Sequence, residues 1–188
     1  MYLPWAPSLQ TIDGAYAGRK VSSIATLGVF AGLAPDPTSY SYNPNLHMGG
    51  GLINFADGDF DNLRYNSTFG FGVSTIGWNM PRPFVFSENS ATYRRAFSVY
   101  HSMQLDKPST GPGVTPVGVG IKDSYLSFRY QPNRRVGFDM NHSYYRDVPT
   151  YDPQLVGTGL LDKSLFQGIS GGVRVELPRR ISLYTSLG

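Results

Sequence analysis

The sequence predicts an all-β fold in which about ten antiparallel strands form an up-and-down meander. Apolar and polar residues alternate with a period of two along most of the chain, which is typical of strands with two different faces. Clusters of Pro, Gly, Asn and Asp separate these segments at regular spacing. No segment of the sequence has the period of an amphipathic helix, and no apolar run approaches the roughly 18 residues of a membrane-spanning helix.

The clearest alternation of apolar and polar residues lies at the C-terminal end, over residues 164–188, and it defines a hairpin unit. Its apolar side chains share one parity: Leu165, Ile169, Val173, Val175 and Leu177. The positions between them form the other face: Phe166, Gly168, Ser170, Gly172, Arg174 and Glu176. Pro178 interrupts the ladder because proline has no backbone N–H to donate, and the alternation resumes at Ile181. The segment therefore predicts a hairpin with one apolar face and one face of small, polar and charged side chains.

We expect the same unit to repeat along the rest of the chain. The other strands are expected over residues 10–19, 24–34, 47–56, 61–74, 84–93, 96–106, 121–130 and 135–146. Of these, 61–74 alternates clearly and 84–93 has the poorest alternation. Arg94-Arg95 is interpreted as a turn that divides 84–106 into two strands, and Asp57-Gly58-Asp59 as a tight turn.

The expected connections alternate in length along the chain. The short ones cover residues 19–22, 57–60, 93–95, 131–134 and 178–180. The longer ones cover residues 35–46, 77–83, 107–120 and 147–163. In an antiparallel meander, alternate connections lie at opposite ends of the sheet, so one rim would carry short turns and the other long loops. Strands of about ten residues, tilted by roughly 45°, would span about 25 Å, the height of the apolar band of a transmembrane β-barrel.

Basic residues occur in pairs at most of the short turns. The pairs are Arg19 and Lys20, Arg94 and Arg95, Arg134 and Arg135, and Arg179 and Arg180. One interpretation is that exposed turns simply collect charged residues. The other is that a basic rim meets acidic lipid headgroups, peptidoglycan or a periplasmic partner.

Six charged residues share the parity of Gly, Ser and Asn and so fall on the polar face of their strands. They are Arg64, Asp123, Arg129, Asp139, Arg174 and Glu176. In a membrane barrel the polar face is the lumen, so we expect these residues to line it. They would either pair with one another and fill a small interior, or line a water-filled channel and set its ion preference. Position on a face does not separate the two.

The composition excludes several classes of function. The 15% of charged residues lies below the roughly 25% of ordinary soluble domains. The chain has no cysteine, which excludes disulfides and thiolate metal sites. The net charge of +3, without a basic stripe among stacking aromatics, gives no reason to expect a nucleic-acid partner.

Catalytic and cofactor motifs are missing from the sequence. His101 and His142 fall on the apolar faces, and Ser143 points away from His142, which argues against a Ser–His couple. The carboxylates are dispersed, with neither a paired acid–base spacing nor a calcium loop. The glycines at 49–51 precede no helix and so do not form a phosphate loop. We therefore expect no enzymatic activity, no cofactor and no metal.

The chain resembles the outer-membrane β-barrel proteins of Gram-negative bacteria, including porin-like members. Segments such as NLRYNSTFGFGVS and SLFQGISGGVRVELP carry the resemblance, together with the alternating short and long connections, over most of residues 10–188. The resemblance implies a single transmembrane barrel domain over residues 1–188, or part of one, in the bacterial outer membrane. It also implies contact with membrane lipid, and passive passage of small solutes or surface scaffolding. The chain departs from the family in lacking a signal peptide and in ending at Gly188 and not at an aromatic residue, so we expect a fragment of a larger barrel.

Two other functions remain open at this point. A secreted β-sandwich or jelly-roll binding module would have similar strands, but its apolar faces would pack against each other and not against lipid. A membrane hydrolase would need a polar triad at one rim.

Overall fold

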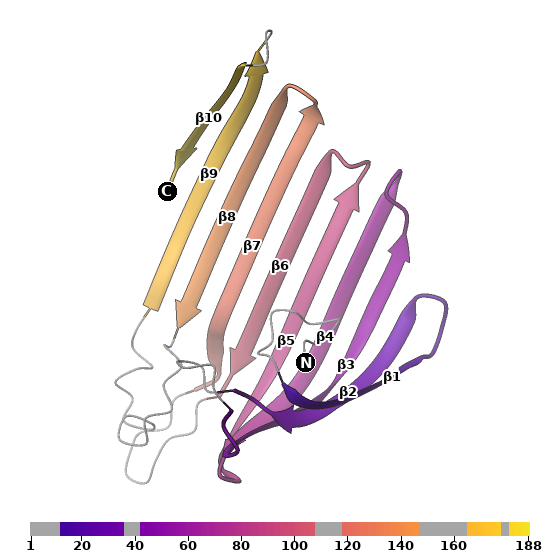
Figure 1. The fold of residues 1–188 in the computed structure, drawn as a ribbon, viewed down its shortest axis with the longest axis vertical. Helices are drawn as coiled ribbons and strands as arrows, with labels where there is room; N and C mark the ends of the chain where they lie inside the picture. The colour runs from indigo at the N-terminus through magenta and orange to yellow at the C-terminus, as the bar shows by residue number, and fades with distance from the viewer. Residues whose placement is uncertain (1–11, 36–41, 108–117, 147–164, 178–180) are drawn as a thin grey trace.

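The computed structural model describes residues 12–35, 42–107, 118–146, 165–177 and 181–188, and all structural statements below refer to them (Figure 1). These residues form a single antiparallel sheet of ten strands in the order β1 to β10, so the predicted all-β meander is confirmed. The strands are β1 (Asp13–Lys20), β2 (Ala25–Leu33), β3 (Leu46–Gly58), β4 (Leu63–Ile76), β5 (Asn79–Tyr93), β6 (Phe97–Asp106), β7 (Gly120–Asn133), β8 (Val136–Arg146), β9 (Leu165–Leu177) and β10 (Ile181–Leu187).

Most strand positions agree with the sequence expectations to within a few residues, but β5 does not. This strand begins at Asn79, not at residue 84, and with 15 residues it is the longest in the described sheet. The connection expected over 77–83 is in fact the two-residue turn Gly77-Trp78, both at positive φ as in a type I′ hairpin. The expected alternation of connection lengths is therefore wrong at this point. The predicted loops over 107–120 and 147–163 lie largely outside the described residues.

The sheet has two chemically different faces, and the register shows that each continues from strand to strand. On one face Val29 lies opposite Gly51, which lies opposite Phe71, and Val85 and Leu105 continue the row. We call this the outer face. The opposite face carries Phe30, whose ring contacts that of Phe86 on β5. It lies inside the curl that the sheet makes on the side of β1 and β2, and we call it the inner face (Figure 1).

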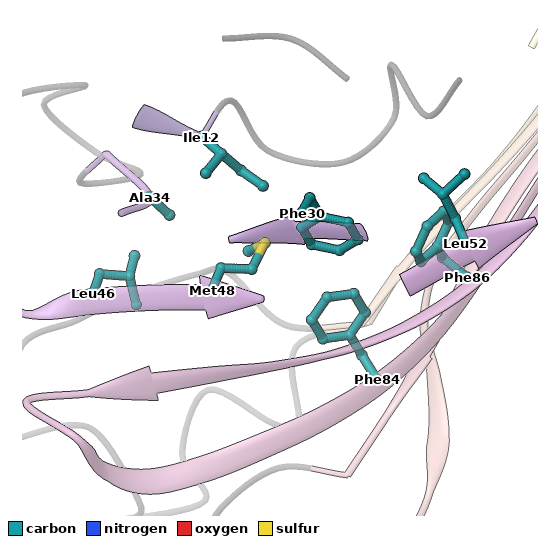
Figure 2. Packing of buried hydrophobic residues seen from close by; sticks show 8 residues of the cluster. All are labelled: Ile12, Phe30, Ala34, Leu46, Met48, Leu52, Phe84 and Phe86. Atoms are coloured by element: carbon teal, nitrogen blue, oxygen red, sulfur yellow. The ribbon is translucent and has the colours of Figure 1, made fainter. Parts of the chain in front are cut away.

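An apolar cluster fills one end of the inner face, inside the curl (Figure 2). Its buried members are Ile12, Phe30, Ala34, Leu46, Met48, Leu52, Phe84 and Phe86. The ring centroids of Phe30 and Phe86 are 6.5 Å apart in an edge-to-face arrangement, although β3 and β4 separate their strands in the sheet. This contact across two intervening strands shows how tightly the sheet curls here.

Glycines on β4 make room for the aromatic rings of the cluster. Gly70 lies opposite Phe86 in the register, and a Cβ atom at Gly70 would overlap the Phe86 ring. Gly72 lies opposite Phe84, whose Cζ atom would be 2.5 Å from a Cβ atom there. An aromatic ring lying over a cross-strand glycine covers the backbone that the glycine leaves bare and allows the sheet to bend.

The β5–β6 turn confirms the division expected at Arg94-Arg95. The backbone N–H of Ala96 donates to the carbonyl of Tyr93 at 3.0 Å, which closes a two-residue hairpin. Arg94 and Arg95 have φ values of 47° and 55°, in the left-handed region that disfavours side chains with a Cβ atom. The turn therefore holds backbone strain at two non-glycine positions.

Arg95→Gly is expected to raise the free energy of unfolding by about 1 kcal/mol, because glycine adopts positive φ without steric cost. The ion pair that it removes, between Arg95 and Asp61 at 3.2 Å, is highly exposed and contributes little. Arg95→Ala is the matched control, because it removes the same ion pair but keeps the strain. Chemical denaturation of the three proteins measures the effect. A glycine variant no more stable than the alanine variant would contradict the strain.

Candidate functional site

Polar side chains occupy the inner face beyond the apolar cluster, in rows that cross the strands. One row runs through register partners on six strands: Asn54, Thr68, Glu88, Ser102, Tyr125 and Ser143. The next row runs from Asn66 through Ser90, Tyr100, Ser127 and Asn141. Both rows come from the polar parity of alternating strands, and together they make the middle of the inner face hydrophilic.

Hydrogen bonds link these side chains to one another. The Nδ2 atom of Asn54 donates to Oδ1 of Asn66 and, at 2.9 Å, to Oγ1 of Thr68. Asn54 and Thr68 are each only 1% exposed, so these bonds satisfy polar groups that water cannot reach. Further along the sheet, the hydroxyl of Tyr100 donates to Glu88 at 3.0 Å. The hydroxyl of Tyr125 donates to Asn141 at 3.1 Å.

A second polar contact lies next to the apolar cluster. Nε of Arg82 and Oδ2 of Asp106 form an ion pair at 2.6 Å, and Asp106 is buried. Asp106 is the register partner of Phe84, so the pair lies beside the apolar cluster, on the side away from the polar rows along β5. Sequence reasoning missed Arg82 because residues 77–83 were interpreted as a connection. It missed the neutral polar residues because only charged side chains were selected, although parity places all of them on the same face.

The six charged residues expected in the lumen all lie on the inner face, but they do not form one group. Arg129, Asp139, Arg174 and Glu176 gather near the turn between β7 and β8. Arg64 is separate, with its guanidinium 4.3 Å from the centroid of the Phe60 ring. Asp123 lies near the opposite end of β7, opposite Gln104 of β6.

The described basic pairs all lie at the end of the sheet that carries the turns β1–β2, β3–β4, β5–β6 and β7–β8, which we call the short-turn end (Figure 1). Arg19 and Lys20 end β1, whereas Arg94-Arg95 and Arg134-Arg135 form turns. Arg179 and Arg180 lie outside the described residues. The short-turn end therefore carries a concentration of positive charge on at least three hairpins.

The Asp57-Gly58-Asp59 segment forms the end of β3 and the start of the β3–β4 turn. Oδ1 of Asp59 accepts hydrogen bonds from the backbone N–H groups of Asn62 and Asp61, each at 2.9 Å. The bonds from Asn62 and Asp61 hold the pKa of the Asp59 carboxyl below its ordinary value. The carboxylate thus serves as an intramolecular acceptor that shapes the turn.

Stability should fall at acidic pH partly through Asp59. Because its pKa is lower in the folded protein, the carboxylate contributes stability above the unfolded pKa of about 3.9, and this contribution is lost as the pH falls through the folded pKa. Asn at this position keeps an acceptor but not the charge. The stability difference between the wild type and Asp59→Asn should therefore shrink on acidification through this range, as measured by denaturation at a series of pH values. A constant difference would contradict the assignment.

The three histidines lie apart from the polar rows. His47 stacks on Trp78 with ring centroids 3.9 Å apart. His101 and His142 lie on the outer face on either side of Leu126, and Nε2 of His142 is 3.1 Å from Nε2 of Gln167. Ser143 lies on the inner face opposite Tyr125, so His142 and Ser143 do point to opposite faces. The described residues thus contain a row of the outer face, through His101 and His142, that is more polar than its surroundings.

The four charged residues that gather near the β7–β8 turn border an open pocket of about 700 Å³. Arg129, Arg134, Arg135 and Arg174 line it, together with Asp139, Glu176 and Tyr184. Within the described ranges, no group of three or more His, Cys, Asp or Glu side chains is arranged to hold a metal ion. The pocket therefore presents guanidinium, carboxylate and hydroxyl groups as its chemistry.

Comparison with protein-family models, with curated proteins and with solved structures found no match for this chain. No helix in the described part of the chain has the length and apolar character needed to cross a membrane. The functional information therefore lies in the two faces of the sheet and in the residues that they carry.

Proposed function

We propose that this chain forms the wall of a β-barrel in a bacterial outer membrane and acts there, without enzymatic activity, as a passive channel for small solutes or as a surface scaffold. The observation that carries the proposal is the distribution of side chains between the two faces of the sheet. Apolar side chains are exposed on the outer face, whereas polar and charged side chains line much of the inner face. This is the reverse of a soluble protein, and it suits a wall between lipid and water.

The outer face supports contact with lipid. Phe71 and Val29 are 64% and 61% exposed, and their neighbours Leu27, Phe69, Val73 and Val85 are exposed as well. A contiguous apolar surface of this kind is unfavourable in water and is usually covered by a partner or a membrane. The strands from β3 to β9 have 10 to 15 residues, enough to cross a hydrocarbon core of about 30 Å when tilted.

The inner face supports a role in solute passage or structural support. Its polar groups bond to one another, as in the Asn54–Thr68 and Tyr125–Asn141 pairs, and none of these pairs couples a nucleophile to a histidine. Charged side chains at its short-turn end would face the interior of a closed barrel. The arginines of the turns would then form a basic periplasmic rim next to acidic headgroups or peptidoglycan.

Refolding from urea into aqueous buffer and into detergent micelles tests this proposal. We expect a β-type far-UV circular dichroism spectrum, and a difference in gel mobility between boiled and unboiled samples, in detergent only. Conductance in planar bilayers then separates a channel from a scaffold. A soluble, monomeric β-protein in buffer alone would contradict the membrane role and would favour the secreted binding module.

A further inference from the structure

The pocket at the short-turn end of the inner face has an open floor at Gly137. Its lining residues come from β6 to β10, near the turn between β7 and β8. Gly137 of β8 lies between the charged side chains, and a Cβ atom there would meet only the Cβ atom of Arg174, at 4.0 Å. The space above Gly137 is therefore unfilled by protein, and side chains from several strands surround it.

Positive charge exceeds negative charge around this space. Four guanidinium groups and two carboxylates line the pocket. Arg174 pairs with Glu176 at 2.8 Å, and Asp139 accepts a hydrogen bond of 3.4 Å from the Tyr184 hydroxyl. Arg129 is the register partner of Asp139, yet their charged groups are not within ion-pair distance. Within the described part of the chain, no ion pair involves Arg129, Arg134 or Arg135.

We propose that this pocket binds a small, doubly charged oxyanion of the phosphate or phosphate-monoester class. Guanidinium groups present planar forks of donors that match phosphate oxygens, and two or more of them can share one dianion. The hydroxyls of Ser98 and Ser127 and the amide of Gln131 lie around the same space and add neutral donors. The volume of about 700 Å³ is ample for phosphate with its bound water.

That the bound oxyanion is a solute passing through a channel rests on the proposed function. That the pocket binds an oxyanion does not. The pocket opens on the inner face, opposite the apolar outer face, so the proposal names a free oxyanion and not a lipid headgroup. A pocket that binds oxyanions near the short-turn end would raise the local concentration of such solutes at one mouth of a channel.

Calorimetric titration of inorganic phosphate into the refolded full chain, at constant ionic strength with chloride as the reference anion, tests the site. Gly137→Val places a side chain in the floor, where its Cβ atom would contact only the Cβ atom of Arg174, and should weaken phosphate binding at least about tenfold while leaving the fold intact. Gly168→Val is the matched control: it lies on the inner face of β9, where its Cβ atom would be 3.4 Å from Ser143 Oγ. That variant should bind phosphate as the wild type does.

Charge variants give an independent measurement. Arg129→Gln should weaken phosphate binding about tenfold, because it removes a charge-assisted donor. Arg94→Gln, which alters an arginine of the same rim outside the pocket, should bind within about twofold of the wild type. Unchanged affinity in both Gly137→Val and Arg129→Gln, or an equal loss in Gly168→Val, would overturn the site. Tighter binding of a short-chain phosphatidic acid than of phosphate would overturn the assignment to a free solute.

These outcomes are distinguishable from failure of the proposed function. Titration can be performed in whichever medium folds the protein, so a protein that folds only in buffer would contradict the membrane role without affecting the test of the pocket. Conductance without phosphate binding would overturn the pocket alone.

Discussion

Replacing Phe86 with alanine is expected to lower the free energy of unfolding by about 3–4 kcal/mol. The Phe86 side chain is only 4% exposed, and it contacts Phe30 across the curl and Phe84 two residues earlier on the same strand. Gly70, beneath the ring, has no side chain that could move into the vacated space. The substitution therefore removes buried apolar area and also leaves a cavity, and it uncovers the backbone of β4.

Equilibrium denaturation in the medium that supports folding measures this effect. Phe86→Leu is the matched control, because it keeps most of the apolar volume and is expected to cost no more than about 1.5 kcal/mol. The difference between the two variants isolates the cavity at the curl. Equal stability of the alanine and leucine variants would contradict the packing of the ring over Gly70.

Phe71→Lys is expected to destabilise the protein by about 2–4 kcal/mol in a lipid bilayer. Phe71 lies near the middle of β4 on the outer face, between Gly51 and Val85, and its ring is largely exposed. In a bilayer this position would face hydrocarbon, where an ammonium group loses its hydration. In water the same exposed position would accept lysine with little change in stability.

Ser127→Lys is the control, since Ser127 lies near the middle of β7 on the inner face. Its neighbours Tyr100 and Asn141 are polar, so this variant should lose less than about 1 kcal/mol. Unfolding titrations of both variants in lipid vesicles, compared with the wild type, give the contrast between the faces. Equal costs for the two lysines would contradict a lipid-facing outer surface.

Local alternation predicted most of the strands because each strand separates apolar from polar residues. It misplaced β5 because this strand does not. Phe84 and Phe86 lie on the inner face with the apolar cluster, while Val85 lies on the outer face, so both parities are apolar over this stretch. Pro81 and Pro83 also resembled turn residues, although β5 contains both and Pro83 aligns with Val73. Phe86 is apolar because it contacts Phe30, and Phe30 lies on β2, far from β5 in the sequence.

The face of each charged residue was predictable from its parity, but the grouping was not. Arg129 and Asp123 share β7 and the inner face, yet only Arg129 reaches the pocket. Which residues meet depends on the stagger between strands, and the register shift between Gln104 and Leu105 alters that stagger beside Lys122. The sequence did not indicate Gly137 as part of the site, because it carries no charge, although its lack of a side chain opens the floor of the pocket.

If the chain enters a membrane as proposed, its two outermost strands have a consequence for the kinetics of insertion. In the described part of the sheet, β1 pairs only with β2 and β10 only with β9, so each of these edge strands has a neighbouring strand on one side only. In hydrocarbon, a backbone N–H or C=O group without a hydrogen-bond partner costs several kcal/mol. A strand edge without a neighbour therefore adds to the free-energy barrier to insertion, and this cost grows as the strand moves deeper into the hydrocarbon. In the proposed membrane role, each edge should therefore gain a neighbouring strand as the chain enters the bilayer, so insertion and edge pairing should share one rate-limiting step.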